Sequence, residues 1–127
     1  MNDQLLIITN NRLCKEKLTN RAKILFDETW NYYQVLMQGY EQINNDYYLL
    51  NHPLSGSIKP NQTPYKSLVF SRHSLASEYN YSSVNLLEQA LTSYQKFQDM
   101  HPTPTWPENV LEDFRLIDLS LIEAIFK

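Results

Sequence analysis

Short apolar runs alternate with helix-spaced stretches in the first half of the chain. Residues 5–9 (LLIIT), 22–26 (AKILF) and 47–51 (YYLLN) are rich in branched and aromatic side chains and predict three strands. Between them, residues 12–20 and 27–44 carry apolar positions three and four apart, which is typical of helices. An order of strand, helix, strand, helix, strand favours parallel strands joined by right-handed crossovers.

Polar residues at the starts of these helices predict their caps. The first helix is expected to start at Asn10 or Asn11, because an asparagine oxygen accepts an otherwise unpaired amide hydrogen. The second is expected to start at Asp27 or Thr29, where acidic groups suit the positive end of the helix dipole.

The second half of the chain predicts one more strand and two long helices. Residues 67–71 (SLVFS) follow residues 47–51 without an intervening helix, so we expect them to return antiparallel as an edge strand, although the long loop leaves this open. Residues 72–81 are a polar connector. Helices are then predicted over 82–100 and 108–126, separated by the proline-rich break HPTPTWP.

Each of the two long helices has one apolar stripe and a predicted start. The first is capped by Ser82 or Ser83. Its inward positions are Val84, Leu87, Leu91, Tyr94 and Phe97. The inward positions of the second are Val110, Phe114, Ile117, Leu121 and Ile125.

Together these elements predict one α/β domain over residues 1–127. It is a small three-layer domain with a mostly parallel four-stranded sheet, order 2-1-3-4, and helices on both faces. Strand order reverses between strands 1 and 3, and ligands of open α/β sheets bind at such a point. The segments expected to meet there are residues 9–11 (TNN) and the loop that opens with Asn51 and His52.

The loop over residues 51–67 differs in composition from the rest of the chain. NHPLSGSIKPNQTPYKS holds three of the six prolines and one of the two glycines. Loops of this length within compact domains are uncommon and often functional, and prolines restrict the unfolded state and favour one shape. The residues predicted to bind a ligand at this edge are Thr9, Asn10, Asn11, His52, Ser55, Gly56, Ser57, Lys59, Asn61, Thr63, Tyr65 and Lys66.

Two parts of this loop have a functional and a structural interpretation. His52 is the catalytic candidate, because a histidine can act as a general base near neutral pH, but at a strand end it can equally bond a backbone carbonyl. Ser55, Gly56 and Ser57 with Lys59 could bind an anion through hydroxyls, amides and an ammonium. The same residue types are also common in ordinary turns.

Composition and spacing argue against several classes of protein. The net charge of −3 and the absence of a basic helix argue against nucleic-acid binding. Scattered histidines and a single cysteine, Cys14, predict no metal site, and we expect this thiol to be buried and inert rather than redox-active. No apolar run has the length of a signal peptide or membrane helix, so the expected location is the cytoplasm.

No dinucleotide cofactor is expected either. Tyr65 and Lys66 resemble the tyrosine–lysine pair of short-chain dehydrogenases in type, but they are adjacent rather than four apart on a helix. No glycine-rich fingerprint follows the first strand.

Three blocks of the sequence resemble the GrdX family. They are LIITNNRL near the start, YYLLNHPLSGSIKPNQTPYKSLVF in the middle and DFRLIDLSLIEAI near the end, and their order spans nearly the whole chain. The family's middle block commonly reads LLTHPLSGSVKPNETPYKS. Here Asn51 replaces threonine, Ile58 valine and Gln62 glutamate, and the last change removes a carboxylate.

The resemblance implies a link to the glycine, sarcosine and betaine reductase systems of anaerobic bacteria, but no established activity or catalytic residue. Two hypotheses follow. In the first, an accessory protein binds a small anionic metabolite, such as a carboxylate or acyl phosphate, at the loop over 51–67 next to the first strand's turn. In the second, a non-catalytic assembly factor docks on a reductase component through the same loop. The sequence leaves the oligomeric state undecided, because Trp106 could pack on the core or anchor a dimer. The block from Asp113 to Asp118 has no assigned role.

Overall fold

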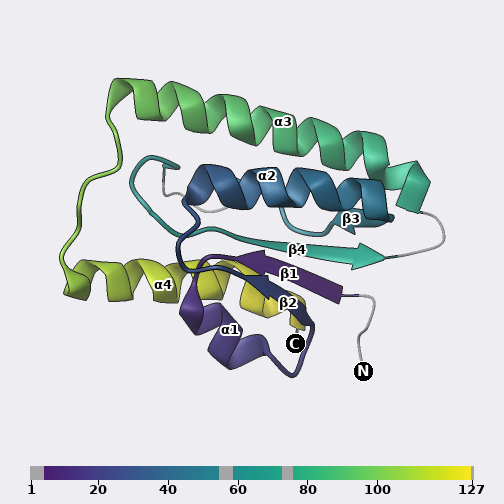
Figure 1. Cartoon of the computed structure of the whole chain (residues 1–127), viewed down its shortest axis with the longest axis horizontal. Coiled ribbons are helices and arrows are strands. Elements are labelled where there is room, and N and C mark those ends of the chain that lie inside the picture. Colours follow the sequence, from purple (N-terminus) through teal and green to yellow (C-terminus); the bar gives the residue numbers. More distant parts are fainter. Residues whose placement is uncertain (1–4, 55–58, 73–75, 127) are drawn as a thin grey trace.

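The chain folds into a four-stranded sheet between two layers of helices (Figure 1). A computed structural model describes residues 5–54, 59–72 and 76–126. The strands are β1 (Leu5–Thr9), β2 (Lys23–Phe26), β3 (Tyr47–Leu49) and β4 (Ser67–Arg72). The helices are α1 (Arg12–Leu18), α2 (Tyr32–Gln42), α3 (Ala76–Met100) and α4 (Glu108–Glu123), with short 3₁₀ turns at Ile43–Asn45 and Ala124–Phe126.

The sheet is mixed rather than mostly parallel, and its strand order is β2-β1-β4-β3. Only β1 and β2 pair in parallel, while β4 pairs antiparallel with both β1 and β3. The antiparallel return of the fourth strand is confirmed, but the predicted order 2-1-3-4 and the edge position of this strand are wrong.

Burial explains why β4 is central. Leu68, Val69 and Phe70 are fully buried, which requires cover on both faces, as for the central strands of a layered sheet. β3 has only three residues, and two of them are half-exposed. A short, partly exposed strand is suited to an edge.

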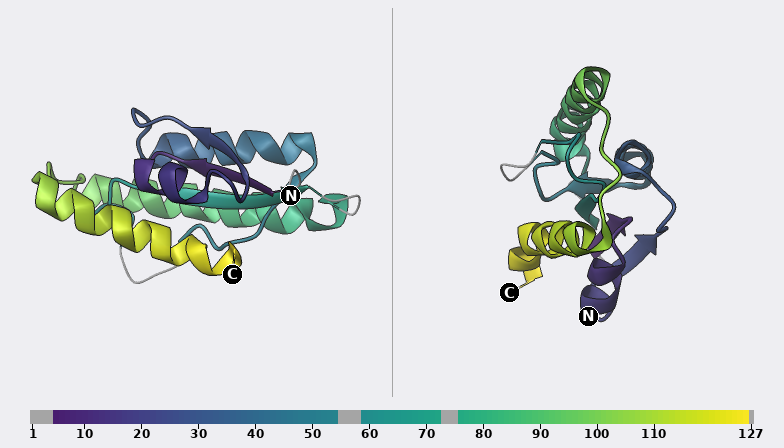
Figure 2. Two further views of the ribbon diagram at one scale, coloured as in Figure 1. Left: turned by 90° about the horizontal axis from the view of Figure 1, so that it is seen from below. Right: turned by 90° about the vertical axis from the view of Figure 1, so that its left-hand side faces the viewer.

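Helices cover both faces of the sheet, as predicted (Figures 1 and 2). α2 and α3 pack on the face that carries Ile8 and Phe70. α1 and α4 pack on the face that carries Ile7 and Val69. The alternation along β1 and β4 therefore divides the core into two clusters on opposite sides of the sheet.

The starts of the first two helices follow local asparagine chemistry. Asn11 caps α1, as predicted, and its side chain accepts a hydrogen bond from the Leu13 amide. The predicted cap of α2 is wrong, because Asn31 caps this helix and forms a capping box with Gln34. The Asp27 carboxylate instead accepts from the amide and hydroxyl of Thr29, which closes a turn ahead of the helix.

α3 starts at Ala76, so the predicted connector over 72–81 and the predicted caps Ser82 and Ser83 are wrong. Ser83 lies within the helix, and its hydroxyl accepts from the Leu49 amide at 3.0 Å. This bond occupies an amide of the edge strand β3. The predicted stripe is confirmed at Leu87, which is fully buried, and at Val84, Leu91 and Tyr94, which pack against the same cluster.

The proline-rich break before α4 is confirmed, since Pro107 is the N-cap residue of that helix. The predicted inward face of this helix is confirmed at Ile125, which packs against the cluster on the α1 side, but elsewhere it is displaced by about one position. Its buried residues are Arg115, Asp118, Leu119 and Ile122, whereas Ile117 is 39% exposed. A hydrophobic pattern places charged residues outward, and here two charged side chains lie inside.

No helix within the described ranges is both long enough and apolar enough to cross a membrane.

Gly39 marks the closest approach of α2 to the sheet. A Cβ atom there would lie 2.7 Å from Leu68 Cδ1 and 3.0 Å from Phe70 Cζ, and both side chains are fully buried. We expect Gly39→Ala to destabilise the protein by about 1–3 kcal/mol through overpacking, despite alanine's better helix propensity. Urea denaturation would measure this, and an unchanged or increased free energy of unfolding would contradict it.

Candidate functional site

Asn10, in the turn after β1, joins three segments of the chain. Its side-chain amide donates to the backbone carbonyls of Trp30 (2.9 Å) and Pro64 (2.8 Å), and its oxygen accepts from the Lys66 amide at 2.9 Å. Both hydrogens of the amide and its oxygen are thereby used. Asn10 thus fixes the end of the long loop beside the segment that leads into α2.

Asn11 joins the same turn to α4. Its side-chain nitrogen donates to the Arg115 carbonyl at 2.9 Å and to Asp118 Oδ2 at 3.0 Å, while its oxygen caps α1. The residue is fully buried. One side chain therefore positions the start of α1, the middle of α4 and a buried carboxylate.

The buried Asp118 carboxylate also ends a chain of hydroxyl groups. Ser67 Oγ lies 2.6 Å from Asp118 Oδ2 and 2.6 Å from Thr9 Oγ1. Because a carboxylate accepts, Ser67 donates to Asp118 and Thr9 donates to Ser67, and Thr9 accepts from the Asn11 amide at 2.9 Å. The direction of every bond in this chain is set by the carboxylate.

Cys14 lies beside this chain and is fully buried, in line with the inert thiol predicted from the sequence. Its sulfur is 3.3 Å from Ser67 Oγ and 3.7 Å from Asp118 Oδ2. Burial, and then the Asp118 charge, raise the pKa of the Cys14 thiol far above its ordinary value. The reactive thiolate is therefore strongly disfavoured.

Lys66 is the most unusual group at this edge. Its side chain is only 4% exposed, and it lines a cavity of about 20 Å³ together with Thr63, Tyr65 and Asp118. Burial lowers the pKa of Lys66 and the Asp118 charge opposes this effect. Within the described part of the chain, its ammonium has no hydrogen-bonded partner and lies 5.6 Å from the Tyr32 ring centre.

An open groove of about 420 Å³ adjoins this cavity. Tyr32, Thr63 and Tyr65 line both spaces, and Asn10 and Trp30 line the groove alone. The groove thus lies at the carboxyl ends of β1 and β2, next to the cavity that Lys66 lines.

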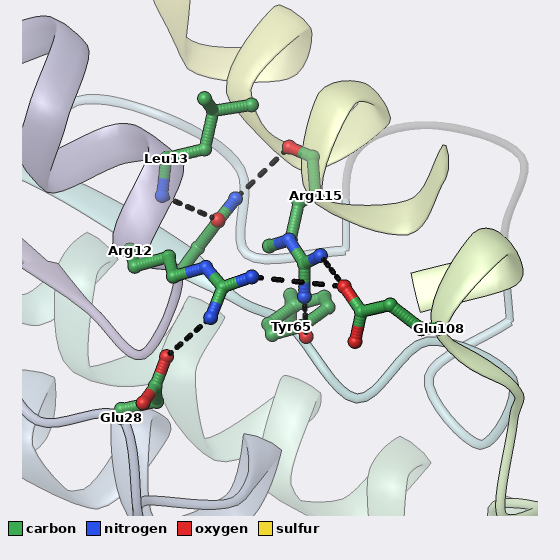
Figure 3. Close-up of polar contacts among 7 residues, drawn as sticks. Arg12, Leu13, Glu28, Tyr65, Glu108 and Arg115 are labelled. Carbon is green, nitrogen blue, oxygen red and sulfur yellow. Dashed lines mark hydrogen bonds and ion pairs between the residues drawn. The ribbon is translucent and has the colours of Figure 1, made fainter. Parts of the chain in front are cut away.

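A chain of alternating charges holds one wall of the cavity (Figure 3). Arg115 donates to the Tyr65 hydroxyl at 2.7 Å and forms an ion pair with Glu108. Arg12 lies 3.6 Å from both Glu108 and Glu28. Arg115 is almost fully buried and holds Tyr65, whereas the Arg12, Glu28 and Glu108 side chains are more than half exposed, so the outer links of this chain are surface ion pairs.

The structure brings the turn after β1 to the far end of the long loop rather than to its beginning. Thr9 is paired with Ser67 in the sheet, so Thr63, Tyr65 and Lys66 gather around residues 9–11. Asn51 and His52 follow the edge strand β3 instead. Asn51 holds β4 through Ser67 and Val69, and His52 is exposed and accepts from the Leu54 amide.

Other predicted site residues lie elsewhere or outside the described ranges. Lys59 and Asn61 line a second groove, against residues 97–106. Ser55, Gly56 and Ser57 lie outside the described residues, so the proposed anion site at these positions stays a prediction.

Sequence reasoning missed the contribution of α4 to this site. The block from Asp113 to Asp118 was given no role, yet Arg115 and Asp118 are buried within it. A usable signal was present, because the block DFRLID places three ionisable residues among apolar ones, and two of them lie on the buried face.

A family model described as GrdX-like protein matches residues 6–127. The chain belongs to the GrdX-like family. Membership links it to glycine reductase, and the family match includes all three blocks of residues that form the buried site. Comparisons with curated proteins and with solved structures gave no significant match.

The dual role of Asn11 predicts a pH-dependent defect. Asn11→Asp keeps an oxygen for the α1 cap but turns a second oxygen towards Asp118 and the Arg115 carbonyl. We expect a loss of about 3 kcal/mol at pH 7, the upper end for a hydrogen bond to a charged group. Repulsion raises the pKa of the new carboxyl group, so stability is lost as pH rises through that pKa and recovers towards pH 5.

Urea denaturation at several pH values would measure this effect. Asn11→Ser, which can cap the helix but adds no charge, is the control, and its defect should not depend on pH in the same range. An equal defect at pH 5 and pH 7 in the aspartate variant would contradict the geometry.

The burial of Lys66 predicts a pH dependence of the opposite sign, in which stability increases with pH. Its pKa is lowered in the folded protein from an ordinary 10.5, so the unfolded state binds more protons and wild-type stability rises with pH across that window. We expect Lys66→Met to be at least as stable as wild type at pH 7, with the difference shrinking towards pH 10. Melting temperatures of both proteins over this range test it, and a marked loss of stability in the variant at pH 7 would show that Lys66 is structural.

Proposed function

We propose that this GrdX-like protein binds a small anionic metabolite of the glycine reductase system in the groove above Lys66. The observation that carries the proposal is a lysine that is only 4% exposed, lines a cavity, and has an ammonium without a hydrogen-bonded partner within the described chain. Burying a charge is costly unless it is paired and hydrogen-bonded. A ligand carboxylate would supply the acceptors that Lys66 lacks.

Asp118 does not remove the need for such a ligand. Its Oδ2 atom already accepts from Asn11 and Ser67. It acts as a fixed countercharge that favours the charged form of Lys66 in an otherwise apolar setting. Asp118 thereby opposes the lowering of the Lys66 pKa by burial and favours the ammonium form that can bind an anion.

Tyr65 supplies a second donor. Its hydroxyl oxygen accepts from Arg115, so its own hydrogen is available to a group in the cavity. Arg115 is held by Glu108 and therefore fixes the direction of this hydroxyl. Tyr65 and Lys66 both line the cavity, so together they offer two donors to an anionic group there.

The dimensions of the site select for small ligands. The cavity of about 20 Å³ has room for roughly one water-sized group. One carboxylate or phosphate oxygen can therefore enter, while the remainder of the ligand lies in the groove of about 420 Å³. This arrangement suits short carboxylates and acyl phosphates.

The test uses Trp30, which lines the groove, as a reporter. In a Trp106→Phe protein it is the single remaining tryptophan. Acetate, glycine, sarcosine, betaine, phosphate and acetyl phosphate are titrated while its fluorescence is recorded, together with thermal shifts. A ligand at a hundred times its dissociation constant should add about 2.7 kcal/mol, or roughly 3–6 °C in melting temperature.

Lys66→Met should abolish both responses, whereas Lys17→Met, at an exposed position on α1, should leave them intact. Responses that survive in Lys66→Met would reject the site. A flat panel in wild type would reject metabolite binding for these compounds and favour the second hypothesis, docking on a reductase component through the loop over residues 51–67.

A further inference from the structure

We infer that a second binding site, separate from Lys66, lies between residues 59–62 and 97–106 and takes an anionic aromatic heterocycle that carries an N–H or NH₂ donor. The groove there has a volume of about 430 Å³, within the range of pockets that hold cofactor-sized molecules. Its lining residues are Lys59, Asn61, Gln62, Phe97, Met100, His101, Pro102, Pro104 and Trp106.

The buried side chain of Asn61 indicates a ligand rather than an inert surface hollow. Asn61 is 8% exposed, and its buried Oδ1 atom has no hydrogen-bonded partner within the described residues. Its nitrogen donates to the His101 carbonyl at 2.8 Å, so an inverted amide would place two oxygens against each other. The orientation is thus fixed, and a residue that lines the groove is left with an unsatisfied acceptor.

The walls of the groove supply flat apolar surfaces and one cation. Phe97 and Trp106 contribute aromatic rings, and the Trp106 indole is anchored by its donation to the Gln62 carbonyl at 2.7 Å. The exposed Lys59 ammonium lies 5.9 Å from the Phe97 ring centre. A planar ring can pack on these aromatic groups while its anionic substituent reaches the lysine.

These requirements define the ligand class. Asn61 Oδ1 needs an N–H or NH₂ donor, the aromatic residues favour a planar ring, and Lys59 favours an anion. The volume is too large for a metabolite of a few atoms to fill. Flavin and adenine mononucleotides meet all four conditions.

The reporter for this site is Trp106 in a Trp30→Phe protein, in which it is the single tryptophan. FMN, riboflavin and AMP are titrated, with the inner-filter effect corrected, and inorganic phosphate is the control for a simple anion. We expect saturable quenching by FMN or AMP, no response to phosphate and weaker binding of riboflavin than of FMN because it lacks the anionic group.

Two substitutions in the same background connect the binding to its residues. Asn61→Ala should weaken binding about ten-fold, as expected for loss of one buried hydrogen bond. Lys59→Ala, at an exposed position that should not disturb folding, should remove the preference for FMN over riboflavin. Lys17→Ala on α1 is the matched control and should bind as wild type does.

The inference is overturned if millimolar FMN and AMP leave Trp106 emission unchanged, which would leave the groove to a protein partner. It is also overturned if Asn61→Ala and Lys59→Ala both bind with wild-type affinity, because the quenching would then arise at another position. The panel that tests Lys66 uses Trp30, so either site can fail without the other.

Discussion

The pair of asparagines after β1 is the constraint on which the rest of this edge depends. Asn10 turns towards the α2 side of the sheet and fixes the end of the long loop, and Asn11 turns towards the α1 side and fixes α4. Almost every polar atom of the two side chains is used within the protein. They were predicted to contact a ligand, but their contribution to the site is to position Lys66 and Asp118, which lie where a ligand could reach them.

Buried polar groups of this kind stabilise a structure only when each one is satisfied. The chain from Thr9 through Ser67 to Asp118 meets this condition, because each hydroxyl both donates and accepts. Asn61 Oδ1 does not meet it within the described part of the chain, and the Lys66 ammonium has a ring contact there but no hydrogen-bonded partner. Lys66 lines the small cavity, and Asn61 lines the second groove. Polar groups that are satisfied within the protein hold the fold, whereas these two groups could bind a ligand.

Local features of the fold could be predicted from the sequence, and pairing between distant segments could not. The strands and the Asn11 cap follow from short-range patterns that the neighbouring residues alone determine. The insertion of β4 between β1 and β3 depends on contacts between residues about sixty positions apart, as with Thr9 and Ser67. The loop of residues 50–66 is long enough to permit either order, so only the greater burial of β4 decides it.

The site was predicted in part for the same reason. Thr63, Tyr65 and Lys66 were expected at this edge, and they lie there, although their function as ligand contacts stays a prediction. Asp118 could not be found from periodicity, because a buried carboxylate on α4 breaks the rule that charged positions face outward. Its burial depends on donors from Asn11 and Ser67, which are distant in the sequence.

The central position of β4 also means that the sheet cannot be completed until the second half of the chain has been synthesised. β1 emerges first, yet its antiparallel neighbour follows more than fifty residues later, and α4 comes last. Until then one edge of β1 is open and the hydroxyl groups of Thr9 and Ser67 lack their carboxylate. Long-range pairing of this kind slows folding, because the entropy of closing a large loop is lost before the contacts form. The lysine cavity is lined from both Lys66 and α4, so a nascent chain lacking α4 has no Asp118 beside Lys66.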